Sequence, residues 1–427
     1  MDAEIIIVGA GIFGLSTAYH LAQHTSDPSA ILVLDRAPPP SNSAASTDLN
    51  KIVRADYSNR LYTELGLEAI EAWEKNPVFK EEGVYHQTGW IMCDEKGSDL
   101  GQRIRKNFQA IGLDPMQELG EGDIRQDWGG LLKDADLSPF GSFYLNPLAG
   151  WADAGRAMEI LAREIKAIGV RYIVGEADRL VLGEHQVKGV KTKIGDTFTA
   201  EKVILCTGAW TSALMTYTED ALEIASEDRI EAQMTAAGVC VAHVQLSEEE
   251  RTQYDRLPVY VYGGQGETIP PTSSGILKFT SPTSFRNTIS TPTNHAISVP
   301  TENQSDAPKG LRDECLNAIQ ARLPQILSNN RPVDYYRLCW DAITPDQHPL
   351  ITRHPHPHLS NLYLAAGGSF HCWKFLPTIG KYVANVLAGI SNGADRDAAW
   401  AWKSEGAKSQ GGVHSKLRPG RELREIH

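Results

Sequence analysis

Three glycines near the start of the chain have the spacing of a dinucleotide-binding turn. Gly9, Gly11 and Gly14 form the pattern Gly-x-Gly-x-x-Gly. In such a turn the first glycine permits a sharp bend, the second lets backbone N–H groups approach a pyrophosphate, and the third lets a helix pack on a strand. Asp35 follows at about the spacing of 20 residues at which a carboxylate accepts hydrogen bonds from the adenosine ribose. Its charge would repel a 2′-phosphate, so the pattern predicts NAD or FAD and does not separate them.

A strand–helix–strand unit is needed to hold these residues. The β-branched run of residues 4–8 precedes the glycines, a helical pattern covers residues 15–22, and the apolar run of residues 30–34 ends at Asp35. Two later apolar runs, at residues 203–206 and 362–366, also end before glycines, as buried strands do at ligand-facing loops. The sequence therefore predicts an α/β fold in which distant segments share one Rossmann-type sheet.

The remaining segments carry more turn signals and fewer runs of this kind. Pro, Ser, Thr and Asn are frequent at residues 268–274 and 281–294. We predict two interleaved domains, which is within the reach of a chain of 427 residues. The cofactor-binding domain comprises residues 1–60, 151–215 and 336–427. The smaller substrate domain, with a mixed or antiparallel sheet, comprises residues 61–150 and 216–335.

Composition narrows the classes of partner. The net charge of −12 offers no basic surface, so we expect no nucleic acid partner. No apolar run reaches the about 18 residues of a membrane span, and the acidic start differs from a signal peptide. The six cysteines lie far apart, with no pair at metal-ligand spacing, so we expect no metal and a reducing compartment. We expect a monomer in the cytoplasm; a peroxisomal location stays open, although residues 425–427 do not form the Ser-Lys-Leu signal.

Cys339 is the cysteine whose surroundings raise a question. It stands in the stretch Tyr335–Asp346, between large apolar residues and just before a Thr-Pro-Asp turn. A free cysteine in such a place is most often a small buried hydrophobe. The neighbouring residues alone do not distinguish this role from that of a thiol that lines a cofactor site.

Five motifs in order resemble those of the monomeric sarcosine oxidase family of flavoprotein amine oxidases. They are the glycine motif and residues 48–54, 207–210, 337–340 and 371–375. The resemblance covers nearly the whole chain and is strongest to the fungal branch, which includes fructosyl amino acid oxidases (amadoriases) and saccharopine or pipecolate oxidases. It implies FAD and a two-domain, glutathione reductase-like fold in which a Rossmann-type FAD-binding domain is interleaved with a smaller substrate domain.

The resemblance also implies roles for individual residues. The cysteine at the position of Cys339 carries FAD through a thioether to the 8α-methyl carbon. Lys278 matches a lysine that lies over the flavin and assists oxygen, and Lys374 and Arg54 match ligands of the substrate carboxylate. Lys403 stands where the fungal enzymes have an arginine that also reaches this carboxylate. The implied cofactor contacts are Gly9, Gly11, Gly14, Asp35, Arg36, Ser46, Lys51, Gly208, Trp210, Cys339, Gly367 and Lys374.

Two departures from the family pattern affect the expected substrate and linkage. Residues 279–283 read Phe-Thr-Ser-Pro-Thr, where amadoriases have acidic residues that help to hold the sugar, so fructosyl amino acids are the less expected substrates. Phe370 and Cys372 replace residues that are usually glycine in sarcosine oxidases. Cys372 is therefore a rival position for flavin attachment.

Three functions are compatible with these observations. We favour an FAD-dependent oxidase of the C–N bond of a secondary amine or an N-substituted amino acid, with imine formation, hydrolysis and reduction of oxygen to hydrogen peroxide. The alternative is an NAD-dependent dehydrogenase of an amino or imino acid, which the glycine motif and Asp35 would serve equally well. The third is a flavin-binding protein without turnover.

Overall fold

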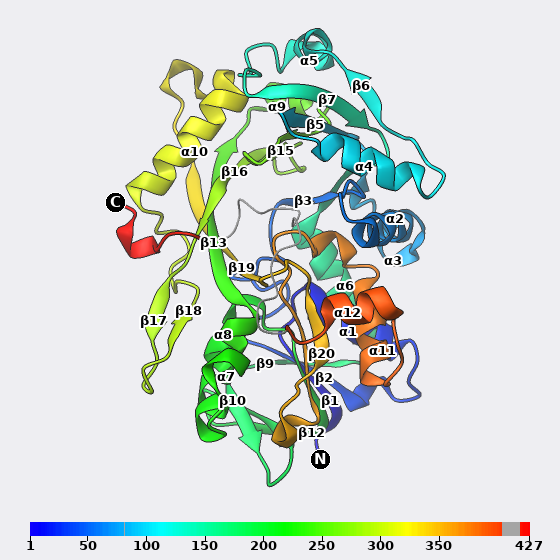
Figure 1. The fold of residues 1–427 in the computed structure, drawn as a ribbon, viewed down its shortest axis with the longest axis vertical. Helices are drawn as coiled ribbons and strands as arrows, with labels where there is room; N and C mark the ends of the chain where they lie inside the picture. Colours follow the sequence, from blue (N-terminus) through cyan, green and yellow to red (C-terminus); the bar gives the residue numbers. More distant parts are fainter. Residues whose placement is uncertain (81, 404–418) are drawn as a thin grey trace.

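The computed structural model describes residues 1–80, 82–403 and 419–427. Two eight-stranded sheets form its frame, one in the lower half and one in the upper half of Figure 1. The first sheet contains β1 (Ala3–Val8), β2 (Ile31–Asp35), β9 (Arg171–Val174), β10 (Ala177–Leu182), β11 (Val187–Thr192), β12 (Thr197–Leu205), β20 (Leu350–Arg353) and β21 (Leu362–Ala366).

Five strands of the first sheet run parallel in the order β9–β2–β1–β12–β21, and β20 pairs antiparallel with β21. The first residues of β12 pair with β11, which pairs antiparallel with β10. Glycine-ended runs that lie more than 150 positions apart in the sequence thus become neighbours, because β12 and β21 join β1 in one sheet. The predicted α/β fold with a Rossmann-type sheet is confirmed.

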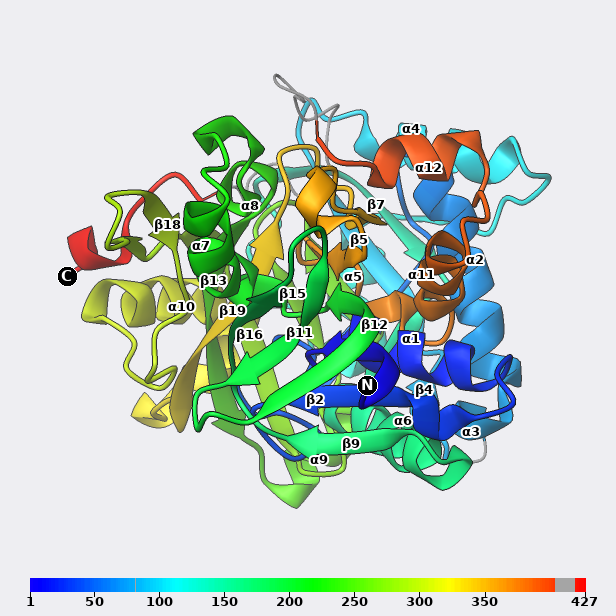
Figure 2. The same cartoon turned by 90° about the horizontal axis from the view of Figure 1, so that it is seen from below.

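Side chains of the first sheet alternate between its two faces, as the period of a strand requires. Ile7 and Val33 pack in the core shared with the helices, whereas Ile6 and Leu32 pack in a separate core on the other face. The helices on the first face are α1 (Ile12–Ala22), α6 (Ala154–Ile168) and α11 (Ile379–Leu387) (Figure 2). Helix α7 (Thr211–Ala221) packs against β10 (Figure 1). Both faces are covered, which explains why these strands are continuously apolar.

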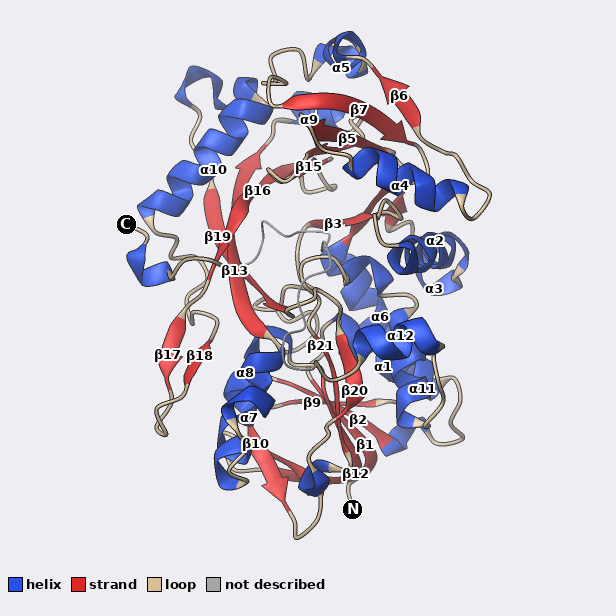
Figure 3. Cartoon of the chain, viewed as in Figure 1, coloured by secondary structure: helices blue, strands red, loops and turns tan. Residues whose placement is uncertain are grey.

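The second sheet has the order β19–β13–β16–β15–β14–β5–β7–β6 and is antiparallel except between β14 and β5. Figure 3 shows β5, β7, β15 and β16 of this sheet in the upper half of the molecule. Helix α10 packs on β13 and β16. The bounds of these elements are β5 (Trp90–Glu95), β6 (Gln117–Leu119), β7 (Phe140–Asn146), β13 (Thr235–Gln245), β14 (Val259–Tyr262), β15 (Glu267–Ile269), β16 (Ile276–Phe285), β19 (Tyr335–Ile343) and α10 (Lys309–Arg322).

Smaller elements complete the fold. A three-stranded sheet has the order β3–β8–β4, and β17 and β18 form a separate pair. Among the described residues, no helix combines the length and the apolar character that crossing a membrane requires. These elements are β3 (Asn50–Val53), β4 (Tyr85–His86), β8 (Gly150–Asp153), β17 (Thr288–Ser290), β18 (Ala296–Ser298), α2 (Arg60–Lys75), α3 (Pro77–Lys80), α4 (Leu100–Gln109), α5 (Glu121–Gln126), α8 (Ile230–Gln233), α9 (Glu248–Tyr254) and α12 (Ala394–Trp400).

The sequence suggested that the last segment of the cofactor-binding domain begins at residue 336, but this residue lies within β19, a strand of the second sheet. Its residues pair with β13 from Tyr335 to Ile343, so residues 336–343 are part of the second sheet. The chain returns to the first sheet only with β20 and β21. The hydrogen-bonding partner of a strand is set by distant residues, and for this reason the local sequence of β19 did not reveal it.

Candidate active site

A cavity of about 740 Å³ is lined by residues of both sheets. Gly9, Gly11 and Asp35 contribute from the first sheet and its loops, and Lys278 and Cys339 contribute from the second. Each of the residues predicted to form the site lines this cavity except Gly14 and Lys403. The structure therefore brings together groups from five or more distant segments of the chain.

The glycine turn leaves space only for hydrogen at two positions. Gly9 has a φ of +100°, and a Cβ atom there would lie 2.5 Å from the carbonyl oxygen of Cys206. A Cβ on Gly14 would lie 1.9 Å from the carbonyl oxygen of Gly9, so this glycine sets how closely α1 approaches β1. The N-terminus of α1 is thereby placed at the cavity wall, where its N–H groups and dipole favour an anionic group such as a pyrophosphate.

Ser46 joins this turn from the loop that precedes β3. Its Oγ accepts a hydrogen bond of 3.1 Å from the N–H of Ile12, and a Cβ on Gly11 would lie 3.1 Å from the same oxygen. Both Gly11 and Ser46 line the cavity. Gly11 therefore keeps the backbone and the serine hydroxyl accessible from one side, as a bound pyrophosphate requires.

Asp35 stands at the end of β2, where a ribose would be recognised. Its carboxylate accepts hydrogen bonds from the N–H groups of Ala10, at 2.7 Å, and Ala37, at 3.1 Å. Burial raises its pKa, and these two hydrogen bonds oppose that rise. Next to it, the guanidinium of Arg36 lies 4.5 Å from the centre of the Trp210 ring. A carboxylate and a planar cation–aromatic pair at one end of the cavity suit an adenosine, so the residues present fit a dinucleotide.

A buried charge cluster connects β3 to the second sheet. The Nζ of Lys278 on β16 lies 2.6 Å from Asp48 Oδ2 and donates a 2.6 Å hydrogen bond to the carbonyl oxygen of Asn50. Lys51 Nζ lies 2.8 Å from the same oxygen of Asp48. Burial alone would raise the pKa of Asp48, but the two lysines hold it well below its usual range. Burial lowers the pKa of Lys278, and Asp48 opposes that shift.

Cys339 lies on β19 opposite Val239 of β13, in the wall of the cavity. It is 5% exposed and packs in a small apolar cluster with Val239, Val241, Ala45 and Phe370. Burial alone would lower the pKa of Lys51, but the Asp48 carboxylate and the Cys339 sulfur raise it, which places a cation near the sulfur. Cys339 is therefore a buried apolar residue, as a free cysteine usually is, but it also lies in the wall of the cavity.

Cys372, the rival position, has different surroundings. It is buried, burial raises its pKa, and it is not among the residues that line the cavity. Of these two cysteines, Cys339 is the one that lines the cavity. This difference could not be obtained from the sequence, in which both cysteines precede a tryptophan.

Two buried basic side chains contact one tyrosine. The Arg54 guanidinium is 4.3 Å from the centre of the Tyr57 ring and 4.7 Å from that of Trp90. Lys374 Nζ donates a 2.7 Å hydrogen bond to Tyr57 Oη and is 4% exposed. Burial and the nearby Arg54 lower the pKa of Lys374 well below its usual value. Arg54, Tyr57 and Lys374 all line the cavity, where two cations can hold a carboxylate.

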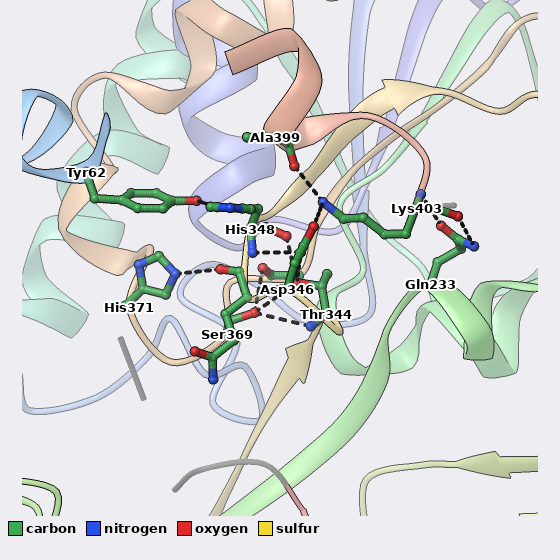
Figure 4. A network of polar contacts seen from close by, with 11 residues as sticks. Tyr62, Gln233, Thr344, Asp346, His348, Ser369, His371, Ala399 and Lys403 are labelled. Carbon is green, nitrogen blue, oxygen red and sulfur yellow. Dashed lines mark hydrogen bonds and ion pairs between the residues drawn. The ribbon is translucent and has the colours of Figure 1, made fainter. Parts of the chain in front are cut away.

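Lys403 does not join this pair. Its Nζ lies 3.0 Å from Asp346 Oδ2 and donates a 2.6 Å hydrogen bond to the carbonyl oxygen of Ala399 (Figure 4). Its backbone N–H donates a 2.7 Å bond to Gln233 Oε1. Lys403 is therefore engaged outside the cavity lining and has a carboxylate partner of its own. The prediction that it reaches the substrate carboxylate rested on the resemblance of residues 400–403 to a segment of the fungal enzymes.

The structure adds two residues that were not predicted. Asp48 bridges Lys278 and Lys51, and Tyr57 lies between Arg54 and Lys374. Asp48 and Lys51 are three positions apart in the sequence, and this spacing could have indicated the ion pair between them. No local signal pointed to the pairing of Asp48 with Lys278, which lies 230 positions away.

Comparison with known proteins gives consistent matches over the whole chain. The family model described as FAD dependent oxidoreductase matches residues 4–386. L-saccharopine oxidase of Schizosaccharomyces pombe is 27% identical over 435 residues, which cover 96% of this chain and 95% of the relative. Monomeric sarcosine oxidase of a Bacillus species is 23% identical over 390 residues, which cover 90% and 92%. The crystal structure of the deglycating fructosamine oxidase of Aspergillus fumigatus, amadoriase II, has a TM-score of 0.81 and 27% identity, covering 94% of this chain and 90% of that one.

Proposed function

Because this chain belongs to the family of FAD dependent oxidoreductases, we propose that it oxidises an amino acid whose nitrogen is a secondary amine. It is an FAD-dependent oxidoreductase acting on the C–N bond of an amine, and the predicted resemblance to flavoprotein amine oxidases is confirmed. Saccharopine, sarcosine and fructosamines share a secondary amine. The NAD-dependent alternative is not favoured, since the relatives are oxidases.

The observation that carries the proposal is the pair of buried basic side chains, Arg54 and Lys374, in the wall of the cavity. Two cations at one place orient a carboxylate and thereby hold the adjacent carbon and nitrogen in register. When bound, FAD accepts a hydride from the carbon beside the amine nitrogen and passes two electrons to oxygen, which leaves as hydrogen peroxide. Trp90 and Tyr57 pack on Arg54 and help to keep water from this region.

The residues that would hold FAD are those of the glycine turn, Asp35 and the Arg36–Trp210 pair. We propose in addition that Cys339 holds it covalently through its 8α carbon. This bond replaces the thiol hydrogen and one methyl hydrogen, and the two electrons released pass to the flavin and then to oxygen. Lys51 lines the same cavity as Cys339 and supplies a positive charge to this region.

Lys278 is the proposed group that assists oxygen. It lines the cavity from β16 and is buried, so its charge acts in a region with little water. A cation there stabilises the negative charge that develops as oxygen is reduced. Thr280, Ser281 and Pro282 line the same cavity where amadoriases have acidic residues, which supports our preference for substrates other than fructosyl amino acids, although Asp94 and Glu267 line the cavity from other strands.

The test is a screen for peroxide release with matched pairs of amines. Sarcosine, pipecolate and proline are each compared with the amine that lacks the carboxylate, namely dimethylamine, piperidine and pyrrolidine; saccharopine and a fructosyl amino acid complete the set. We expect turnover of at least one amino acid and little or none of its partner. Equal turnover of both members of a pair contradicts the carboxylate anchor, and a yellow protein that releases no peroxide with any of them is a flavin-binding protein without this activity.

The covalent bond has its own test. After precipitation in acid, flavin should remain with the protein and map to the peptide that contains Cys339. Cys339→Ala should release it, whereas Cys372→Ala should not. Flavin that stays bound in Cys339→Ala contradicts the assignment.

We also propose that the enzyme is a monomer of the cytoplasm. The relative from Bacillus is named as monomeric, which supports the first part. Light scattering coupled to size exclusion would test it, because a dimer would elute at twice the chain mass of 46.8 kDa.

A further inference from the structure

A lysine in the cavity wall has no carboxylate partner in the part of the chain that the structure describes. Lys374 is 4% exposed, and its Nζ donates to two neutral acceptors, Tyr57 Oη at 2.7 Å and the carbonyl oxygen of His371. No ion pair joins it to a carboxylate within the described residues, in contrast to Lys278 and Lys403. A buried ammonium without such a partner is costly, and lysine responds to burial by losing its proton.

The hydrogen bonds of Lys374 match those of a neutral amine. An ammonium has three N–H donors, whereas a neutral amine has two donors and one lone pair. Two acceptors contact Nζ, which is the number of donors that the neutral form has, and Lys374 also lines the cavity. These contacts suit a lysine that can accept a proton.

The surroundings of Lys374 on balance disfavour a proton on its Nζ. Burial lowers the pKa of Lys374 most, Arg54 and Lys51 lower it further, and Cys372 opposes them. Burial and the negative charges nearby raise the pKa of Tyr57, so this phenol stays neutral. The oxygens of Asp56 accept hydrogen bonds from Tyr144 and Asn146. The charged and titratable groups that face this region are Lys51, Arg54, Asp56, Tyr57, His371 and Cys372.

Chemistry at the substrate supplies the proton. Amino acids in neutral water carry an ammonium nitrogen and a carboxylate, but the nitrogen needs a lone pair before the adjacent carbon can lose a hydride. The proton on nitrogen must therefore leave before oxidation. A carboxylate placed beside Lys374 strongly favours protonation of that lysine.

We infer that Lys374 takes the proton from the ammonium nitrogen of the bound substrate, so that a zwitterion becomes a neutral amine beside a protonated lysine. One N–H bond of the substrate breaks and one N–H bond on Nζ forms, with no net exchange of protons with the solvent. The inference rests on the proposed function, because it takes the carboxylate to bind next to Lys374. It assigns to this residue a proton-accepting role in addition to charge pairing.

Proton uptake on binding of a carboxylate without an amine tests the first half of the inference. Methoxyacetate is sarcosine with an ether oxygen in place of its nitrogen, so Lys374 must take its proton from solvent. Calorimetric titrations of the holoenzyme in buffers of different ionisation enthalpy should give uptake of about one proton per site at a pH above the pKa of the free lysine. There the dissociation constant should rise about tenfold per pH unit.

Two variants make this result specific. Lys374→Arg keeps a permanent cation and should bind methoxyacetate without proton uptake. Lys374→Met should bind more weakly, also without uptake. Binding by the unaltered enzyme without uptake overturns the inference while the carboxylate anchor stands, and uptake that persists in Lys374→Arg assigns the proton to another group, such as His371. No binding of methoxyacetate overturns the carboxylate anchor itself and the inference with it.

A second measurement follows the proton of the substrate. Sarcosine, or whichever amino acid the peroxide screen identifies, is mixed with the holoenzyme without oxygen in weak buffer containing a pH indicator. Before the flavin bleaches, the unaltered enzyme should release no proton, and Lys374→Arg should release about one per site, because its cation is already formed. Release of a full proton by the unaltered enzyme would overturn the inference.

Discussion

Replacing Asp48 by asparagine should destabilise the protein more than replacing either lysine that it contacts. Oxygen Oδ2 of Asp48 lies 2.6 Å from Lys278 Nζ and 2.8 Å from Lys51 Nζ. The side chains of Asp48 and Lys278 are 7% and 4% exposed, so water screens this pair weakly. Removing one partner of such a buried pair costs about 3–5 kcal/mol, because the remaining charge has no counterpart.

The contacts predict an asymmetry between the variants. Asp48→Asn leaves two lysines without a counter-ion, whereas Lys278→Met leaves Asp48 paired with Lys51. We therefore expect Lys278→Met to cost only about 1–2 kcal/mol, mainly for its hydrogen bonds to Asp48 and Asn50. In the double variant Asp48→Asn/Lys278→Met only one unpaired lysine remains. The loss in the free energy of unfolding of this double variant should therefore be smaller than the sum of the two single losses by at least about 1 kcal/mol.

Urea unfolding of the holoenzyme, followed by tryptophan fluorescence, measures these differences. Glu71→Gln is the control, because it breaks an ion pair to Lys75 that is exposed at the surface, and it should leave the midpoint unchanged. Equal costs for the two single variants, or costs that add in the double variant, would refute the description of Asp48 as a shared counter-ion.

Three further changes have defined outcomes. Lys278→Met should slow reoxidation by oxygen by roughly 10²–10³-fold, the loss expected for one electrostatic stabiliser, and slow anaerobic reduction by substrate far less; equal losses in stopped-flow traces would assign the lysine to folding or substrate binding. Arg54→Met should weaken binding of amino-acid substrates or carboxylate inhibitors by roughly 2–5 kcal/mol, as measured by flavin absorbance titration, and an unchanged dissociation constant would remove it from the anchor. Burial raises the pKa of Glu219 from 4.5 to about 7, so the folded state binds this proton more tightly and stability should fall as pH rises from about 4.5 to about 7. Glu219→Gln, which can still accept the 2.7 Å hydrogen bond from the Ile230 N–H, should remove up to about 3 kcal/mol of that loss in urea titrations at each pH, and an unaltered pH profile would contradict the burial of this charge.

The cofactor half of the site was readable in the sequence because its requirements are local. A dinucleotide turn needs a strand, three glycines and a helix in immediate succession, and Gly9 and Gly14 occupy positions where a Cβ would collide with backbone atoms. Asp35 follows the next strand, and β1 and β2 pair in register from Ile5 with Ile31 onward. Steric and hydrogen-bonding constraints within about 35 residues leave few alternatives, so the pattern and the fold agree.

The substrate half could be predicted only in part. The resemblance placed Arg54 and Lys374 in the site, and both line the cavity. It also placed Lys403 there, but Asp346 and the Ala399 carbonyl oxygen engage this side chain elsewhere. Whether a lysine meets a substrate or a carboxylate of its own chain depends on residues that are distant in sequence, and these have no local signature.

The sequence by itself determined the α/β class, the dinucleotide turn and the order of motifs that identified a flavoprotein amine oxidase. Those features depend on spacing, side-chain size and alternation, which act between near neighbours along the chain. Only the tertiary structure decided that Cys339 and not Cys372 lines the cavity, that Asp48 bridges Lys278 and Lys51, and that Lys374 is buried with no carboxylate partner among the described residues. These properties depend on burial and on charges brought within a few ångströms, which arise when β19, β16 and the loop before β3 meet across two sheets.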